Sequence, residues 1–229
     1  GSPSSSGWWP KHTRTRNGAP GLGNSPAHAV FSNAMTTLAP ALSARYAPRV
    51  RPWLRDLTLV VAGSLLMAGL AQVQIPLPFT PVPLTGQTFG VLLVAAALGS
   101  KRGPLAMLLY LFEGAMGLPF FAGASGGLHV LAGATAGYLF GFVVAAYIIG
   151  LLAERGLERS VRTSFVPFLV GTAVIYLFGV GWLAILLGSF EQAVIAGLLP
   201  FLAGDLVKLA LASAALPAAW RLVGRSQDR

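Results

Sequence analysis

Two residues of opposite charge, Asp205 and Lys208, stand in an otherwise apolar stretch, LPFLAGDLVKLALASAALPAAWR. Their spacing of three residues places both on one face of a helix. A charged group at membrane depth costs about 2.5–3.5 kcal/mol on insertion scales, so such groups pair with each other or face a polar cavity. A lysine ammonium can bind a carboxylate, and an aspartate accepts N–H donors. The pair indicates either an ion pair that bridges helices or a binding site for a small polar anion.

Few other residues in the apolar part of the chain can do chemistry. Glu113 lies near the end of an apolar stretch, where we expect it to reach the membrane surface or to pair with Lys208. His129 has no second histidine at ligand spacing, so no metal site is predicted. Cysteine is absent, which excludes thiolate ligands, disulfides and a cysteine nucleophile. No G-x-x-x-x-G-K-[ST] motif occurs, so we expect the chain to hydrolyse no ATP by itself.

The composition places these residues in a membrane protein. Of the 229 residues, 55% are hydrophobic and 10% are charged, whereas soluble domains have about 25% charged residues. So little polar material cannot coat a water-facing surface, and lipid is the natural solvent. The net charge of +9 fits topology signals that also contact anionic headgroups. Nucleic-acid binding is not expected, because the basic clusters are short and separated by apolar stretches.

The sequence predicts an all-α integral membrane domain of six transmembrane helices over residues 57–223. The expected spans cover residues 57–75, 85–99, 103–117, 128–153, 165–187 and 200–220. A hydrocarbon core of about 30 Å needs about 20 helical residues. The second and third spans are shorter, so we expect them to tilt or to extend into their loops. A short interfacial segment over residues 191–199 should precede the last span.

The basic residues predict the orientation. Of the 16 Lys and Arg residues, 15 fall before the first span, between the second and third, between the fourth and fifth, or after the last. All four regions lie on one side of a six-span arrangement, and the three opposite connections carry none. The positive-inside rule then places both termini in the cytoplasm. Lys208 is the exception and lies, with Asp205, in the outer half of the last span.

The predicted outer connections are irregular and apolar. QIPLPFTPVPLTGQT, residues 74–88, has four prolines, which remove backbone donors and favour extended geometry. We expect a stiff cap there rather than a helix. GLPFFAGASGGLHVLAGATAGYLFGF, residues 117–142, is rich in glycine, which permits a tight re-entry. Irregular backbone at membrane depth is tolerated where it lines a cavity, so these segments and LPFLAGD predict a ligand pocket open to the outside.

The two ends of the chain are expected to lie outside the membrane domain. Residues 1–56 are predicted to form a cytoplasmic tail without regular structure, and residues 224–229 a second, short one. The first 34 residues are rich in Gly, Ser, Pro and Asn and have no apolar period. Met35 is a candidate natural start, so residues 1–34 are a candidate non-native extension and carry no weight in the fold prediction.

The three irregular segments, in this order and spacing, resemble the BioY family over about residues 57–223. BioY proteins are the biotin-specific substrate-capture (S) components of energy-coupling factor (ECF) vitamin transporters. The resemblance implies a six-helix S-component bundle that binds biotin near the outer face with high affinity. It implies no enzyme activity and no cofactor, with biotin as the transported ligand. The implied partners are a coupling transmembrane protein and two ATPase subunits, in a prokaryotic plasma membrane.

The resemblance also implies roles for single residues. Asp205 and Lys208 fall on the family's Asp-x-x-Lys pair, and Gln87 falls in its TGQT element. Thr135 and Tyr138 fall in the family's G-P-T-G-G-Y-like stretch, which reads AGATAGY here. Lys208 is expected to engage the biotin carboxylate or another polar partner. Asp205 is expected to accept an N–H donor or to orient Lys208. Which end of biotin meets each residue stays open at this point.

Ser64 and Ala68 are the expected contact with the coupling subunit. They are small residues four positions apart on the first span, which is the spacing that the family uses for this docking. Small residues at this spacing allow two helices to approach closely.

Two other classes of function are compatible with a polytopic membrane protein. A membrane-embedded enzyme would need a nucleophile or a metal site, and the apolar part offers one histidine and no cysteine. A proton-coupled secondary transporter of a small carboxylate would use Glu113 or Asp205. Binding of labelled biotin, turnover without partners, and uptake that is sensitive to uncouplers separate the three classes.

Overall fold

Apolar helices form most of the structure, as the hydropathy pattern predicts. The structure is a computed structural model and describes residues 37–46 and 49–225. Within these residues, five helical segments are long and apolar enough to cross a membrane. They are Pro52–Gln72, Gln87–Ala115, Ala136–Glu154, Val161–Leu187 and Phe190–Trp220. The predicted all-α membrane architecture is confirmed, whereas the count of six spans and the orientation stay predictions.

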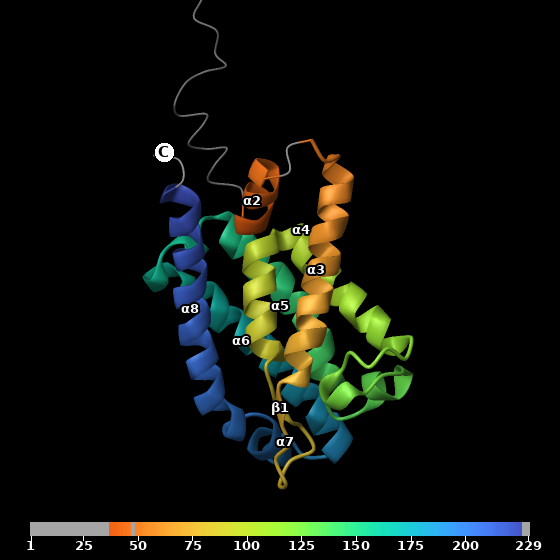
Figure 1. Ribbon diagram of the computed structural model, residues 1–229. Helices are drawn as coiled ribbons and strands as arrows, with labels where there is room; N and C mark the ends of the chain where they lie inside the picture. The colour runs from red at the N-terminus through yellow and green to blue at the C-terminus, as the bar shows by residue number, and fades with distance from the viewer. Residues whose placement is uncertain (1–36, 47–48, 226–229) are drawn as a thin grey trace, which may run out of the picture. The chain divides into compact units, whose positions relative to one another are not determined.

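The helices pack as a bundle around α5. In chain order the described elements are α2 (Leu38–Tyr46), α3 (Pro52–Gln72), β1 (Gln74–Ile75), β2 (Leu84–Thr85), α4 (Gln87–Ala115), the 3₁₀ helices η1 (Ala122–Ala124) and η2 (Leu128–Ala132), α5 (Ala136–Glu154), η3 (Leu157–Arg159), α6 (Val161–Leu187), α7 (Phe190–Gly197), η4 (Leu199–Phe201) and α8 (Leu202–Arg225). α5 packs against both α4 and α6 (Figure 1). α3 packs on α4, and α8 packs on α6 and α4.

A sharp bend at Gly99 divides α4 into two halves. Gly99 has φ 84° and ψ −177°, a backbone conformation that residues with a Cβ rarely adopt. The second half begins at Ser100, whose backbone N–H and hydroxyl donate to the Glu154 carboxylate of α5 at 2.8 and 2.9 Å. A carboxylate at a helix N-terminus satisfies free N–H groups and complements the helix dipole. The predicted spans 85–99 and 103–117 correspond to these two halves.

Ordered structure begins earlier in the chain than the predicted tail boundary at residue 56. α2 (Leu38–Tyr46) is a helix, and α3 already begins at Pro52, where proline suits the first turn of a helix. α2 contacts α3, α4 and α8. The expected extension over residues 1–34 and most of the expected C-terminal tail lie outside the described residues, since the described chain ends with α8 at Arg225.

The irregular connections gather at the end of the bundle opposite α2, as Figure 1 shows for β1, α7 and the start of α8. β1 and β2 pair antiparallel, with Gln74 opposite Thr85, and close the Pro-rich loop over residues 76–83. The Thr80 hydroxyl donates to the Ala196 carbonyl of α7 at 2.7 Å. The loop is therefore a cap tied to α7, as the prolines predict. We call this end of the bundle the loop end.

The fourth predicted span begins later than expected. Residues 128–132 form the 3₁₀ helix η2, and α5 begins only at Ala136. Gly127, which precedes η2, has φ 104°, and Gly133 follows η2 in an extended conformation. Glycine loses much conformational freedom in a regular helix, so these glycines interrupt the apolar stretch that suggested a longer span.

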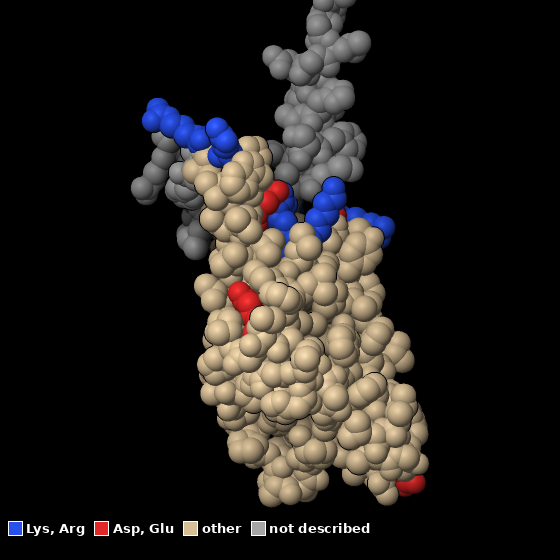
Figure 2. Space-filling model, turned by 90° about the vertical axis from the view of Figure 1, so that its right-hand side faces the viewer, with Lys and Arg blue, Asp and Glu red and all other residues tan. Residues whose placement is uncertain are grey.

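Lysine and arginine side chains gather at the opposite end, as Figure 2 shows for one face. We call it the basic end; it carries the start of α3, the bend in α4, the α5–α6 connection and the end of α8. Arg102, beside the bend, pairs with Asp56 of α3 at 2.8 Å. These are the regions that the sequence predicted to share one side. That this side is the cytoplasm stays a prediction.

The α5–α6 connection at the basic end contains a fully buried acid. Glu158 in η3 has 0% of its surface exposed, and the Nε of Arg159 lies 3.8 Å from its carboxylate. Burial disfavours the charged carboxylate and raises the pKa of Glu158 from 4.5 to about 7, while the positive charge of Arg159 offsets part of the rise. This group therefore links the stability of the connection to pH.

The close contact at the bend predicts the effect of enlarging Gly150 of α5. A Cβ at position 150 would overlap the Gly99 carbonyl carbon and the Ser100 nitrogen, which are backbone atoms that cannot turn aside. We expect Gly150→Ala to lower the free energy of unfolding by about 1–3 kcal/mol, measured by unfolding in mixed detergent micelles. Gly181→Ala is the matched control, because a Cβ there meets no atom within 4 Å. Equal stability of both variants would contradict the close packing.

The buried acid predicts a pH dependence of stability. Between about pH 4.5 and 7 the folded chain holds the Glu158 proton that the unfolded chain releases, so stability should fall as the pH rises through this window. Glu158→Gln keeps the shape without the titration. We expect the variant to lack this slope and, above pH 7, to exceed the wild type by up to about 3 kcal/mol. Identical pH profiles of unfolding for both proteins would refute this assignment.

Candidate ligand-binding site

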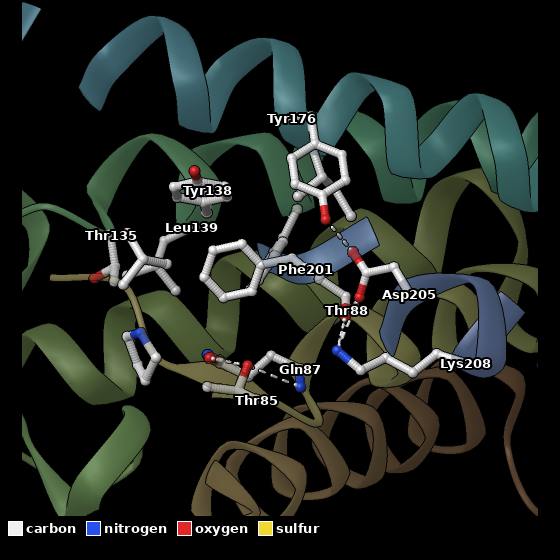
Figure 3. A pocket seen from close by; sticks show the side chains of 14 residues that line it. Thr85, Gln87, Thr88, Thr135, Tyr138, Leu139, Tyr176, Phe201, Asp205 and Lys208 are labelled. Carbon is white, nitrogen blue, oxygen red and sulfur yellow. Dashed lines mark hydrogen bonds and ion pairs between the residues drawn. The ribbon is translucent and has the colours of Figure 1, made fainter. Parts of the chain in front are cut away.

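Four polar side chains from three helices meet at the loop end, around the carboxylate of Asp205. Lys208 Nζ donates to Asp205 Oδ1 and to Thr88 Oγ1, each at 2.9 Å. The Thr88 hydroxyl lies 3.2 Å from Asp205 Oδ1, to which it donates. The Tyr176 hydroxyl donates to Asp205 Oδ2 at 2.5 Å. One carboxylate thus joins α4, α6 and α8, and Figure 3 shows the three partners converging on it.

The Asp205–Lys208 pair is largely buried but keeps a small exposed surface. The Asp205 side chain is 8% exposed and that of Lys208 is 17% exposed. Both oxygens of Asp205 already accept hydrogen bonds, whereas Lys208 uses two of the three donors that an ammonium carries. The structure therefore shows the internal ion pair that the sequence offered as one interpretation. It also leaves Lys208 with the capacity for one further acceptor.

The pair borders a cavity of about 500 Å³, including the space at its open mouth. Its walls come from the Pro-rich loop, α4, α5, α6, η4 and α8. The lining residues are Val82, Pro83, Thr85, Gln87, Thr88, Thr135, Tyr138, Leu139, Phe142, Ile175, Tyr176, Phe201, Asp205 and Lys208. Mostly apolar walls with a few placed polar groups are typical of small-molecule sites. In Figure 3 Thr135 lies on the side opposite Lys208, with the Phe201 ring between them.

The three other predicted ligand residues all line this cavity, but they differ in whether their polar groups already bind protein partners. Gln87, at the start of α4, donates to the Tyr110 hydroxyl at 2.7 Å and accepts from the Thr85 hydroxyl at 3.0 Å. Thr135 precedes the first turn of α5, and its hydroxyl forms no hydrogen bond with the described residues. Gln87 is thus held by protein partners, while Thr135 is available to a ligand.

Tyr138 contributes its ring to the cavity and its hydroxyl to the scaffold. The hydroxyl donates to the Gly197 carbonyl of α7 at 2.7 Å. The ring meets the Tyr176 ring edge to face, with centroids 6.4 Å apart. Gly179 of α6 lies so close to the Tyr138 ring that a Cβ there would overlap it. Tyr138 therefore fixes α7 and Tyr176 relative to α5.

The structure adds residues that the sequence reasoning did not select. Thr88 follows Gln87 directly in the sequence, and this position was the one signal available for it. Tyr176 is a polar aromatic residue inside an apolar span, and that was the one signal available for it. Phe201 gave no signal, because phenylalanine is common throughout this chain.

Several other candidates lie apart from the cavity. Glu113 accepts a hydrogen bond from the Ser64 hydroxyl and does not pair with Lys208. His129 is exposed in η2. Among the described residues no group of three or more His, Cys, Asp or Glu side chains could hold a metal ion. Glu113 is therefore part of the α3–α4 contact rather than of the ligand site.

Ser64 and Ala68, the expected coupling contact, face the inside of the bundle. Ser64 is 0% exposed and Ala68 is 7% exposed, on a helix that packs on α4. A partner helix could reach these two side chains only if α3 shifted relative to α4.

The bundle and its cavity define a membrane-embedded helical protein with a candidate ligand site. The sequence pattern of the BioY family matches residues 35–225. This match covers most of the chain, and the chain belongs to the BioY family.

Named relatives are similar to this chain in sequence, and one solved structure is similar in fold. The biotin transporter BioY of Thermotoga maritima is 41% identical over 155 residues, which cover 68% of this chain and 90% of that protein. The probable biotin transporter BioY of Pyrococcus horikoshii is 45% identical over 139 residues, which cover 61% and 81%. The crystal structure of the S-component for biotin from an ECF-type ABC transporter matches with a TM-score of 0.67. It covers 73% of this chain and 92% of that chain at 24% identity, a likeness of fold.

The Tyr138 hydroxyl predicts a measurable contribution to stability. Tyr138→Phe leaves the buried Gly197 carbonyl without its partner, so we expect a loss of about 1–2 kcal/mol in the free energy of unfolding. Faster amide hydrogen exchange in α7 should accompany the loss. Tyr147→Phe is the matched control, because Tyr147 is 51% exposed. A Tyr138→Phe variant as stable as this control would show that the hydrogen bond does not hold α7.

Proposed function

We propose that this protein is the high-affinity biotin-capture component of an ATP-driven ECF vitamin transporter. The observation that carries the proposal is the Asp205–Lys208 pair, which borders a cavity with mostly apolar walls at the loop end. The relatives named above are biotin transporters, and the similar solved chain is an S-component for biotin. The protein acts in transport and not as an enzyme.

Biotin suits this cavity because it combines an apolar bicycle with two polar ends, a ureido group and a carboxylate. We assign the carboxylate to Lys208, which has one donor beyond those used by Asp205 and Thr88. Asp205 then orients Lys208, because its Oδ1 accepts from the Lys208 ammonium while its Oδ2 is occupied by the Tyr176 hydroxyl. The ureido group lies toward Thr135, on the opposite side of the cavity. Phe201 and Leu139 contact the bicycle between these ends.

Release into the cell needs partners. The chain lacks the phosphate-binding motif of ATPases, so the energy comes from two ATPase subunits through a coupling transmembrane protein. The complex resides in a prokaryotic plasma membrane, with the basic end inside and the loop end outside. Docking through Ser64 and Ala68 requires α3 to move away from α4, which would also break the Ser64–Glu113 hydrogen bond.

Equilibrium binding of labelled biotin to the purified full chain tests this function. We expect sub-micromolar affinity for the wild type. Lys208→Met keeps the length of the side chain but removes the charge, and should weaken binding about 100-fold (roughly 3 kcal/mol). Lys101→Met is the matched control, since Lys101 is exposed at the basic end. It should bind like the wild type.

A competition panel of other vitamins completes this test. A biotin capture component should bind biotin in their presence, because the cavity recognises its carboxylate and its bicycle together. Absence of biotin binding in the wild type, or Lys208→Met binding as tightly as Lys101→Met, would rule out the proposal.

A further inference from the structure

Tyr176 and Asp205 line two hollows, one on each side of them. The first is the cavity described above. The second is a groove between α6 and α8 of about 760 Å³, including open space. It is lined by Leu169, Thr172, Ala173, Tyr176, Leu198, Leu202, Asp205, Leu206 and Leu209. The Tyr176–Asp205 hydrogen bond therefore spans the boundary between the cavity and the groove.

The groove opens on the outer surface of the bundle. Its rim residues Leu169, Leu202 and Leu206 are 49%, 42% and 59% exposed, and apart from the shared pair its lining is almost wholly apolar. A surface of this kind on a transmembrane helix faces acyl chains. Among the lining residues, Tyr176 and Asp205 are the two that border both the cavity and this groove.

The position of the Tyr176 ring is fixed from two directions. Its hydroxyl donates to Asp205 Oδ2 at 2.5 Å, and its ring packs edge to face on Tyr138. Lys208 donates to the other oxygen of the same carboxylate at 2.9 Å. The Tyr176 hydroxyl and the Lys208 ammonium therefore approach the Asp205 carboxylate from opposite sides, as Figure 3 shows, and the Tyr176 ring continues the wall that Asp205 forms beside Lys208.

Building on the proposed function, we propose that Tyr176 is a specificity-determining residue that limits the length of the ligand. Its ring, with the Asp205 carboxylate that it binds, forms the wall between the cavity and the groove. A ligand whose chain ends at the carboxylate fits, whereas one whose chain continues beyond that point meets the ring. Without the ring, an alkyl extension of the ligand would enter the groove, where burial among apolar side chains is favourable.

Two biotin amides isolate this effect, one with an N-methyl and one with an N-octyl group. Both lack the carboxylate, so the lost interaction with Lys208 cancels in the ratio of their dissociation constants. We expect this ratio, octyl over methyl, to fall at least tenfold in Tyr176→Ala and to fall less in Tyr176→Leu. It should stay within twofold of the wild type in Tyr176→Phe, which keeps the ring, and in Tyr147→Ala, which removes an exposed tyrosine that does not line the groove.

A second measurement tests, without any biotin, whether Tyr176 separates the cavity from the lipid phase. The chain has no cysteine, so Leu139→Cys places a single thiol in the cavity wall. Labelling of this thiol by membrane-dissolved N-octylmaleimide should accelerate at least tenfold when Tyr176→Ala is added, and should not accelerate with Tyr176→Phe. An unchanged labelling rate, or biotin binding with an unchanged amide ratio, would overturn the role of Tyr176 alone. Failure of the wild type to bind biotin would overturn the proposed function instead, while the labelling rates would still decide whether Tyr176 is the wall.

Discussion

The carboxylate of Asp205 is the interaction on which the site depends. In an apolar bundle a single ammonium is costly, and Asp205 compensates Lys208 while it also accepts hydrogen bonds from Thr88 and Tyr176. These partners belong to three different helices, so the hydrogen bonds to one carboxylate fix the relative positions of α4, α6 and α8. The cavity beside it keeps its shape for the same reason. Stability and recognition at this end of the molecule cannot be separated.

Close backbone contacts made possible by glycine bring the remaining walls into place. The bend at Gly99 lets α4 turn back on itself, and Gly150 lets α5 lie directly against that bend. Near the other end, Gly179 lets the Tyr138 ring pack directly against α6. In a membrane, where helices gain little from burying apolar area, such close packing is a main source of association. Glycine contacts at both ends of the bundle therefore position the helices that form the cavity walls.

The sequence predicted the parts of this structure that carry an unusual residue type in an unusual place. Asp205 and Lys208 stood out because charges are rare in apolar stretches, and the prolines marked the capping loop. Tyr176 and Phe201 were not selected, because aromatic residues in a membrane span give no periodic signal that separates a cavity wall from a lipid-facing surface. The start of α5 was placed too early for a related reason. Hydropathy does not distinguish the 3₁₀ turns of η2 from a true helix, and only the glycines around it limit the span.

The Pro-rich loop has a consequence for the kinetics of capture. It is closed at its base by the β1–β2 pair and tied near its tip by the Thr80–Ala196 hydrogen bond. Four prolines leave it few alternative conformations, so little entropy is lost when it settles over a ligand. A loop this stiff is expected to open as one rigid unit rather than by gradual local motions. The lifetime of the captured molecule would then be set by the motion of the Pro-rich loop and not by the individual contacts within the cavity.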